Sequence, residues 1–216
     1  MDFRQTILNL IIIMPVFLLS ISVHEFSHGY AAYLKGDPTA KNRGRLTLNP
    51  VAHLDVMGTL VLVLTQMIGW AKPVPVNPGF FKDPRKDMMF VSVAGPASNL
   101  VLAFLLALFR HFLIFTGLLP AWSGIYLTGS GAADVVGMLF FLGIRLNIAL
   151  AFFNLIPVPP LDGSKILRGL LPPRYDHIIN KLEGPQGMIL IVILVMFGLH
   201  RIVLLPLINF FMGILI

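Results

Sequence analysis

Long apolar stretches dominate the chain, and loops rich in glycine, proline and basic residues separate them. Three stretches, at 6–34, 88–109 and 135–156, are long enough as helices to cross a hydrocarbon core of about 30 Å. A fourth stretch, at 188–216, is apolar apart from one histidine and one arginine. It predicts either one span with an interfacial helix or a bent hairpin.

The shorter segments between these spans carry different patterns. Residues 41–50 are basic and partly alternating, which predicts a short strand or hairpin. The apolar run at 56–68 is only about half as long as a span requires, which favours a re-entrant segment. The prolines of 70–78 exclude a helix and a central strand, so an edge strand or an extended segment remains. Together the patterns predict an all-α polytopic membrane protein with about four to six transmembrane helices, a short β-hairpin or edge strand and a re-entrant segment.

The composition agrees with a membrane protein and narrows its chemistry. Of the 216 residues, 56% are hydrophobic and 12% are charged, whereas soluble domains average about 25% charged residues. We therefore expect a single membrane-embedded domain over residues 1–216. The net charge of +6 suits loops that set topology and meet anionic lipid better than it suits nucleic acid. Because the chain has no cysteine, any metal must bind to His, Asp or Glu.

The basic residues predict the orientation of the chain. Of the 16 lysines and arginines, four lie in 35–54, four in 70–87 and four in 157–187, whereas 110–134 has only Arg110. If the short apolar run re-enters, the three basic segments share one face, which the positive-inside rule makes cytoplasmic. We therefore expect a multi-pass protein of the cell membrane.

The first span contains His24, Glu25 and His28 in an otherwise apolar sequence. Residues four apart on a helix face the same way, so both imidazoles can bind one ion, with the site nearer the cytoplasmic face. Glu25 lies one step round the helix, where a general base for an activated water belongs. The alternatives are a chance match or two histidines hydrogen-bonded in a bundle core. Burying a charged Glu in lipid costs roughly 2 kcal/mol or more, which favours the metal site.

A catalytic metal site usually has a third protein ligand and one open position. The candidates are His53, Asp55, Asp134 and Asp162, of which Asp134 falls on the opposite side of the membrane. Asp162 follows a span that prolines interrupt, and irregular backbone at that depth lines a cavity. The alternative for Asp162 is a helix cap. For His53, a surface position is favoured over a transient metal ligand.

Three motifs together resemble the site-2 protease family of intramembrane zinc metalloproteases: HEFSH at 24–28, GPASN at 95–99 and NLIPVPPLDG at 154–163. They lie on three apolar spans in the family's order. The resemblance covers roughly residues 7–170 as a catalytic core and leaves 187–216 as accessory C-terminal helices. The chain has no room for an inserted PDZ module or a pair of CBS modules, so it is similar to a compact prokaryotic branch.

The resemblance implies one zinc ion per chain, with His24, His28 and Asp162 as its ligands. It implies Glu25 as the base and places Asn154 near the reacting carbonyl. Asn154 would then donate a hydrogen bond to the oxyanion; its alternative role is to tie helix ends together.

The expected function is that of an intramembrane endopeptidase, which hydrolyses peptide bonds in or near transmembrane segments in regulated intramembrane proteolysis. Its partners would be a transmembrane protein substrate and the lipid bilayer, with a homo-oligomer left open and no nucleic acid. Val74, Val76 and Asn77 would hold the unwound substrate as an added strand, unless their segment is a plain connector. The alternatives are a polytopic zinc or ion transporter, although no internal repeat is apparent, and an inactive homologue that binds membrane partners.

Overall fold

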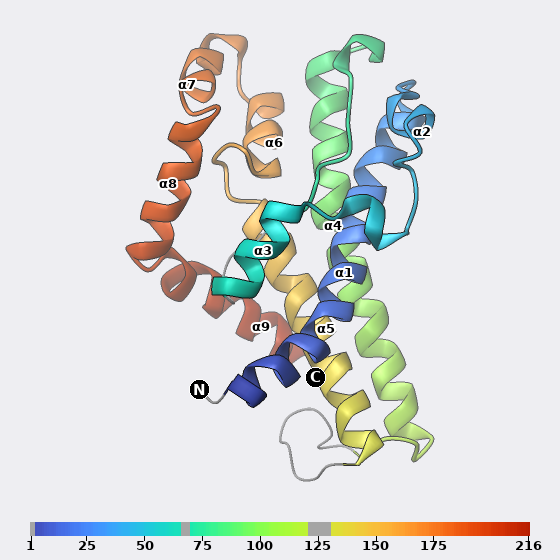
Figure 1. Ribbon diagram of the computed structural model, residues 1–216. Helices are drawn as coiled ribbons and strands as arrows, with labels where there is room; N and C mark the ends of the chain where they lie inside the picture. The colour runs from blue at the N-terminus through green and yellow to red at the C-terminus, as the bar shows by residue number, and fades with distance from the viewer. Residues whose placement is uncertain (1–2, 66–69, 121–130) are drawn as a thin grey trace.

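The computed structural model describes residues 3–65, 70–120 and 131–216 and shows a bundle of helices (Figure 1). The helices are α1 (Phe3–Leu34), α2 (Thr39–Asn42), α3 (Val56–Thr65), α4 (Pro84–Phe115), α5 (Ala132–Asn154), α6 (Asp162–Leu170), α7 (Asp176–Lys181), α8 (Pro185–Met196) and α9 (Leu205–Leu215). The shorter turns are η1 (Pro50–His53), η2 (Pro78–Phe80), η3 (Pro173–Tyr175) and the π-helical η4 (His200–Leu204). Within these ranges the chain forms no β-sheet.

Among the described residues, three helices are long and apolar enough to cross a membrane: α4, α5 and the part of α1 from Ile12 to Leu34. A fourth crossing results only if the bent pair Pro173–Lys181 and Pro185–Met196, which meet at 75°, forms one span. The expectation of about four to six spans is therefore met at most at its lower limit in the described chain. The difference arises at the C-terminus, where Gly198, at a φ of +91°, separates two helices that are each too short to span.

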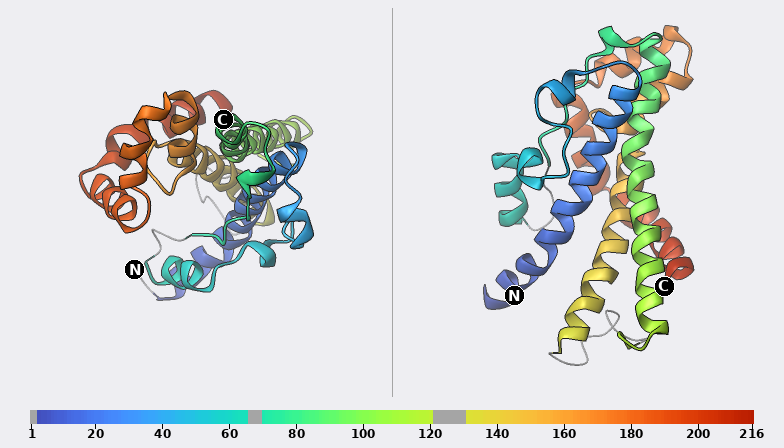
Figure 2. Two further views of the ribbon diagram at one scale, coloured as in Figure 1. Left: turned by 90° about the horizontal axis from the view of Figure 1, so that it is seen from above. Right: turned by 90° about the vertical axis from the view of Figure 1, so that its right-hand side faces the viewer.

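Close packing of α1, α4 and α5 builds the centre of the bundle. These three helices lie side by side at the centre, with the N-terminal part of α1 tilting away from the other two, whereas α7 and α8 stand apart from α1 (Figure 2). Ala103 and Ala107 on α4 are buried in one cluster with Ile144 and Ile148 on α5. Small side chains allow helix backbones to approach closely, which stabilises association in lipid. This packing brings the polar residues of the three helices within reach of one another.

The strand or hairpin predicted for 41–50 does not form in the described chain, and of the two alternatives for 70–78 the extended segment is observed rather than the edge strand. Residues 41–50 contribute to the end of α2, to turns and to the start of η1. Only Leu54 and Ala71 pair, as an isolated antiparallel bridge. Arg45 Nη2 donates to two backbone carbonyls of 70–78, at 2.7 and 3.3 Å. A side chain thus occupies backbone groups that a neighbouring strand would need, and the alternating pattern of 41–50 does not reveal this.

One end of the bundle collects the charged connections. The end of α1, the start of α4 and the helices α2, α6 and α7 lie there, whereas the end of α4 and the start of α5 lie at the opposite end (Figure 1). Lys35 Nζ lies 2.9 Å from Asp87 Oδ1, and Arg85 Nη1 lies 2.9 Å from Asp176 Oδ2. With only 10 residues, α3 is too short to cross, which agrees with a re-entrant segment. The last part of that predicted segment, 66–68, lies outside the described residues.

We expect the three basic segments to face the same side of the membrane. Single cysteines at Lys41, Lys82 and Arg174, which are exposed at this end, should react with an impermeant maleimide from one side only. A cysteine at Thr116, just after α4, should react only from the other side. The native chain has no cysteine, so each label reports one position. Labelling of Lys41 and Lys82 from opposite sides would mean that the chain crosses the membrane between them.

Candidate metal centre

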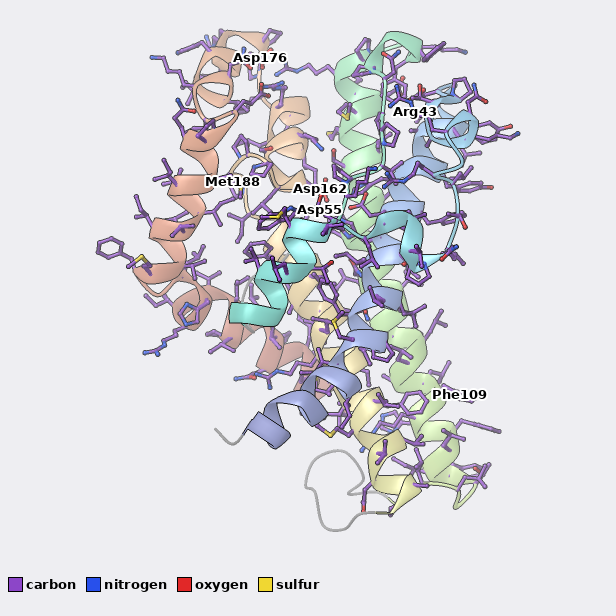
Figure 3. All side chains as sticks on the ribbon, viewed as in Figure 1. Arg43, Asp55, Phe109, Asp162, Asp176 and Met188 are labelled. Carbon is purple, nitrogen blue, oxygen red and sulfur yellow. The ribbon has the colours of Figure 1, made fainter. Side chains whose placement is uncertain are left out.

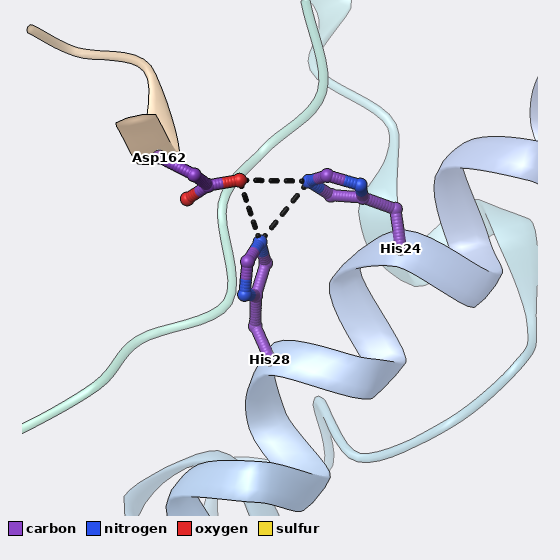
Figure 4. A group of neighbouring side chains, drawn as sticks. All are labelled: His24, His28 and Asp162. Carbon is purple, nitrogen blue, oxygen red and sulfur yellow. Dashed lines mark hydrogen bonds and ion pairs between the residues drawn. The ribbon is translucent and has the colours of Figure 1, made fainter. Parts of the chain in front are cut away.

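Two histidines and one aspartate meet at a buried point of the bundle (Figure 4). His24 Nε2 and His28 Nε2 are 3.0 Å apart, and they lie 3.2 and 3.1 Å from Asp162 Oδ2. The histidines come from successive turns of α1, and the carboxylate comes from the first turn of α6. The described chain contains no other such group of three His, Asp or Glu side chains.

The outer nitrogen of each imidazole is already bonded to α4. His24 Nδ1 donates to Asn99 Oδ1 at 2.6 Å, and His28 Nδ1 donates to the Val91 carbonyl at 2.7 Å. A neutral imidazole carries one ring proton, and here an oxygen acceptor on α4 holds it at Nδ1. Both Nε2 atoms therefore present a lone pair to the space between the three residues.

This donor set fits a metal ion. Two imidazole lone pairs and a carboxylate oxygen, all 3.0–3.2 Å apart, repel one another unless a cation lies between them. A tetrahedral ion with bonds of about 2.0–2.1 Å holds its ligand atoms about 3.3 Å apart, close to these distances. A carboxylate binds a metal ion in its ionised form, so Asp162 would supply the one negative charge of this donor set.

Two roles were considered for Asp162, metal ligand and helix cap, and its contacts bear on both. The residue preceding α6, Leu161, is its N-cap, and no side chain in the described structure caps this helix. Asp162 Oδ2 faces the histidines instead, and Oδ1 lies 3.9 Å from Lys165 Nζ. Along the bundle, Asp162 lies between Asp176 at one end and Phe109 towards the other, and nearer to Asp176 (Figure 3).

The other candidates for the third ligand have different partners. Asp55 Oδ1 accepts from the Gly58 N–H at the start of α3, and Asp134 lies in the first turn of α5. The favoured surface position of His53 is wrong, because this residue is fully buried. Its Nε2 donates to the Thr47 carbonyl at 2.8 Å, so it helps to fold the segment that precedes α3.

Glycines at two positions make room for the site. A Cβ on Gly95 of α4 would collide with His28 Nε2 and would lie 2.7 Å from His24 Cε1. Gly95, the first residue of the GPASN motif at 95–99, therefore faces the two imidazoles, since a position without a side chain allows this close approach of α1 and α4. A Cβ on Gly163 would collide with the Leu155 carbonyl, so this glycine lets the start of α6 pack closely against the end of α5.

Glu25 lies beside the metal group without being part of it. It is half-buried, and its Oε2 accepts from the Val74 N–H at 2.8 Å. Asn154, the last residue of α5, donates from Nδ2 to the Leu150 carbonyl one turn earlier. Its amide is thus bonded within its own helix, and its predicted role at the reacting carbonyl stays a prediction.

The predicted substrate segment is held against α1. The Asn77 N–H donates to the buried Asp37 at 2.6 Å, and Asn77 Oδ1 accepts from the Gly79 N–H. Val74 is buried, and the half-buried Val76 packs against a cluster that includes Ala32. The anchor at Asp37 was not predicted from the sequence, where its signal is an acidic residue directly after a span.

The profile of "Peptidase family M50" matches residues 12–199. The chain belongs to this peptidase family. Membership confirms the resemblance to site-2 proteases and makes the chain a metalloprotease. It is 42% identical over 192 residues to the "Putative zinc metalloprotease YwhC" of Bacillus subtilis, covering 89% of this chain and 83% of that one.

More distant relatives carry similar names. A Mycolicibacterium smegmatis protein, "Putative zinc metalloprotease Rip2", is 32% identical over 200 residues, which cover 88% of this chain and 69% of that one. The "Zinc metalloprotease MJ0392" of Methanocaldococcus jannaschii is 25% identical over 182 residues, covering 84% of this peptidase and 41% of that protein. No solved structure matches the chain significantly.

A methyl group at position 95 should displace the metal ligands. Gly95→Ala should lower metal affinity by about 10-fold or more, since the new Cβ would collide with His28 Nε2. The matched control is Gly213→Ala in α9, where a Cβ meets no atom within 4 Å. Metal content after dialysis against a graded chelator measures both. Equal affinities in the two variants would contradict the close contact at Gly95.

Removing the charge of Asp162 should weaken the metal site and leave the helix intact. Removing a residue that only hydrogen-bonds to a metal ligand lowers metal affinity by about 10–100-fold. Asp162→Asn changes a ligand itself, so it should lower the affinity further. Excess metal should restore part of the activity. The circular dichroism spectrum should not change, because Asp162 does not cap α6. Unchanged metal content across a metal titration would remove Asp162 from the ligand set.

Proposed function

We propose that the chain is a zinc-dependent intramembrane endopeptidase that hydrolyses peptide bonds in or near transmembrane segments, in regulated intramembrane proteolysis. The observation that carries the proposal is the position of the metal group. His24 and His28 lie within a candidate span, buried beside α4, and Asp162 completes the group from α6. A peptide bond that reaches these residues must come from a membrane-embedded segment or pass alongside one.

Zinc is the metal that the donor set supports best. Two imidazoles and one carboxylate are a known ligand set for catalytic zinc, with a fourth position left for water or substrate. The relatives named above as zinc metalloproteases support the same ion. Bound zinc supplies a water of lowered pKa and polarises the substrate carbonyl.

The residues around the ion have separate tasks. Glu25 takes a proton from the water and later returns it to the leaving amine. The Val74 N–H holds one carboxylate oxygen of Glu25, which fixes the side chain beside His24. Asn154 stabilises the negative charge on the carbonyl oxygen, after its amide turns from the Leu150 carbonyl.

The segment Val74 to Asn77 is proposed to hold the unwound substrate as an added strand. Glu25 and Asp37 already bind the N–H groups of Val74 and Asn77, which fixes the segment in place. Among the described residues, no hydrogen bond reaches the N–H of Val76 or the carbonyls of Val74 and Val76. Free backbone groups on an extended, anchored segment suit pairing with an extended peptide.

The membrane placement follows from the charged end of the bundle. We propose a multi-pass protein of the cell membrane, with this basic end in the cytoplasm and the metal group nearer to it. Residues 1–216 form one membrane-embedded domain, in which 7–170 carry the catalysis and 187–216 are accessory helices. Transmembrane proteins are the substrates, and apolar side chains such as Phe115, 89% exposed, face the lipid.

Glu25→Gln should retain stoichiometric zinc and lose proteolysis by about 100-fold or more, the usual range for removing a general base. The matched control is Glu183→Gln, an exposed glutamate that pairs with Arg168 and is not part of the metal group. Purified full-length protein in proteoliposomes would be tested for zinc content and for chelator-sensitive cleavage of a membrane-spanning peptide. Loss of zinc in Glu25→Gln would make Glu25 a ligand, and zinc flux without cleavage in the wild type would favour a transporter.

A further inference from the structure

A fully buried polar network joins the three central helices behind His24. Its members are Ser20 on α1, Asn99 on α4 and Asn147 on α5, each at most 1% exposed. Polar groups at this depth cost free energy unless they are hydrogen-bonded. In this network every amide oxygen and nitrogen has a partner, so its hydrogen bonds have a defined direction.

A backbone carbonyl of α5 fixes which way the Asn147 amide points, and with it the donors and acceptors of the network. Asn147 Nδ2 donates to the Gly143 carbonyl at 2.8 Å and to Ser20 Oγ at 2.8 Å. A backbone carbonyl only accepts, so the nitrogen of the Asn147 amide must lie on that side. Ser20 Oγ agrees with this orientation, because its own proton goes to the Val16 carbonyl at 2.8 Å. Asn147 Oδ1 is therefore turned towards α4.

The orientation of the Asn147 amide fixes that of the Asn99 amide, which is bonded to His24. Asn99 Nδ2 donates to Asn147 Oδ1 at 2.7 Å and to the Ser20 carbonyl at 3.2 Å. Its Oδ1 is consequently turned to His24 and accepts from Nδ1 at 2.6 Å. The proton of the His24 imidazole is thereby kept at Nδ1, and the Nε2 lone pair faces Asp162.

We infer that Asn147 and Ser20 are positioning residues, which act through Asn99 to fix the tautomer and the ring orientation of His24. The inference rests on the proposed metal site, and neither residue touches the metal or the substrate. The two histidines are held in different ways. His28 is oriented by one main-chain carbonyl, Val91, whereas His24 depends on side chains from three helices. Metal affinity should therefore depend on substitutions several residues away from the site.

The competing explanation is that the network only holds the helices together, since interhelical hydrogen bonds also stabilise membrane bundles. The two roles differ in what they predict for folded protein. A purely packing role predicts lower thermal stability of the metal-free chain and unchanged zinc affinity. A positioning role predicts weaker zinc binding, beyond any change in stability, and recovery of cleavage at high zinc concentration.

The chain offers a matched pair of serines for the test. Ser20 and Ser22 are both buried on α1, and each donates to the carbonyl four residues earlier, at 2.8 and 2.6 Å. Only Ser20 also accepts from Asn147. Ser20→Ala and Ser22→Ala thus remove the same kind of group from the same helix, and only the first disturbs the network.

The experiment measures the zinc dissociation constant of purified full-length variants by competition with a chromophoric chelator, and the thermal unfolding of each metal-free variant. Asn147→Leu should weaken zinc binding by about 10–100-fold, and Ser20→Ala should weaken it less, in the same direction. Ser22→Ala should bind zinc as the wild type does. Saturating zinc should restore cleavage in Asn147→Leu.

The outcomes distinguish a failure of the positioning role from a failure of the proposed function. Wild-type zinc affinity in both Asn147→Leu and Ser20→Ala, with an active wild type, would overturn the positioning role alone. A wild type that neither binds zinc nor cleaves would overturn the proposed function together with it. If Asn147→Leu does not fold, the comparison of Ser20→Ala with Ser22→Ala decides, and equal affinities there reject the inference.

Discussion

The site depends on the fold holding three buried electron-pair donors close together against their mutual repulsion. His24, His28 and Asp162 stay together because other parts of the chain hold each of them and a cation can lie between them. α4 supplies most of this support: it gives an acceptor to each imidazole and, at Gly95, the bare surface on which the rings lie. Without that surface, the two histidines would have no room to face the carboxylate.

Local periodicity explains why the histidine pair and the three long spans were predictable. The spacing of His24 and His28 places them on the same face of any helix. A long apolar run with few charges is typical of a transmembrane helix. Asp162 was harder, because its place depends on how the chain after α5 returns to α1. Irregular backbone at membrane depth indicated a cavity, but only the distances showed that the carboxylate faces the two imidazoles rather than capping α6.

Tertiary contacts explain what the sequence left out. The alternating pattern of 41–50 suggested a strand, but Arg45 binds the carbonyls that a strand partner would need. His53, read as a surface residue, is enclosed because its imidazole bonds to the turn at Thr47. The hydrogen-bonded relation of Asn99 to Asn147, 48 residues away, has no signal in a single sequence. Each of these features depends on residues that are distant in the chain or on the course of a loop.

The position of Asp162 on α6, outside the candidate spans, has a consequence for biosynthesis. A carboxylate at the centre of an inserting helix costs about 2.5–3.5 kcal/mol on the translocon scale. Here the carboxylate of Asp162 lies on none of the three described candidate spans, so it does not add this cost to the insertion of α1, α4 or α5. Chains emerge from the ribosome N-terminus first, so the nascent protein passes through insertion with an incomplete centre. Hydrolytic competence is thus acquired only once the bundle around it has assembled.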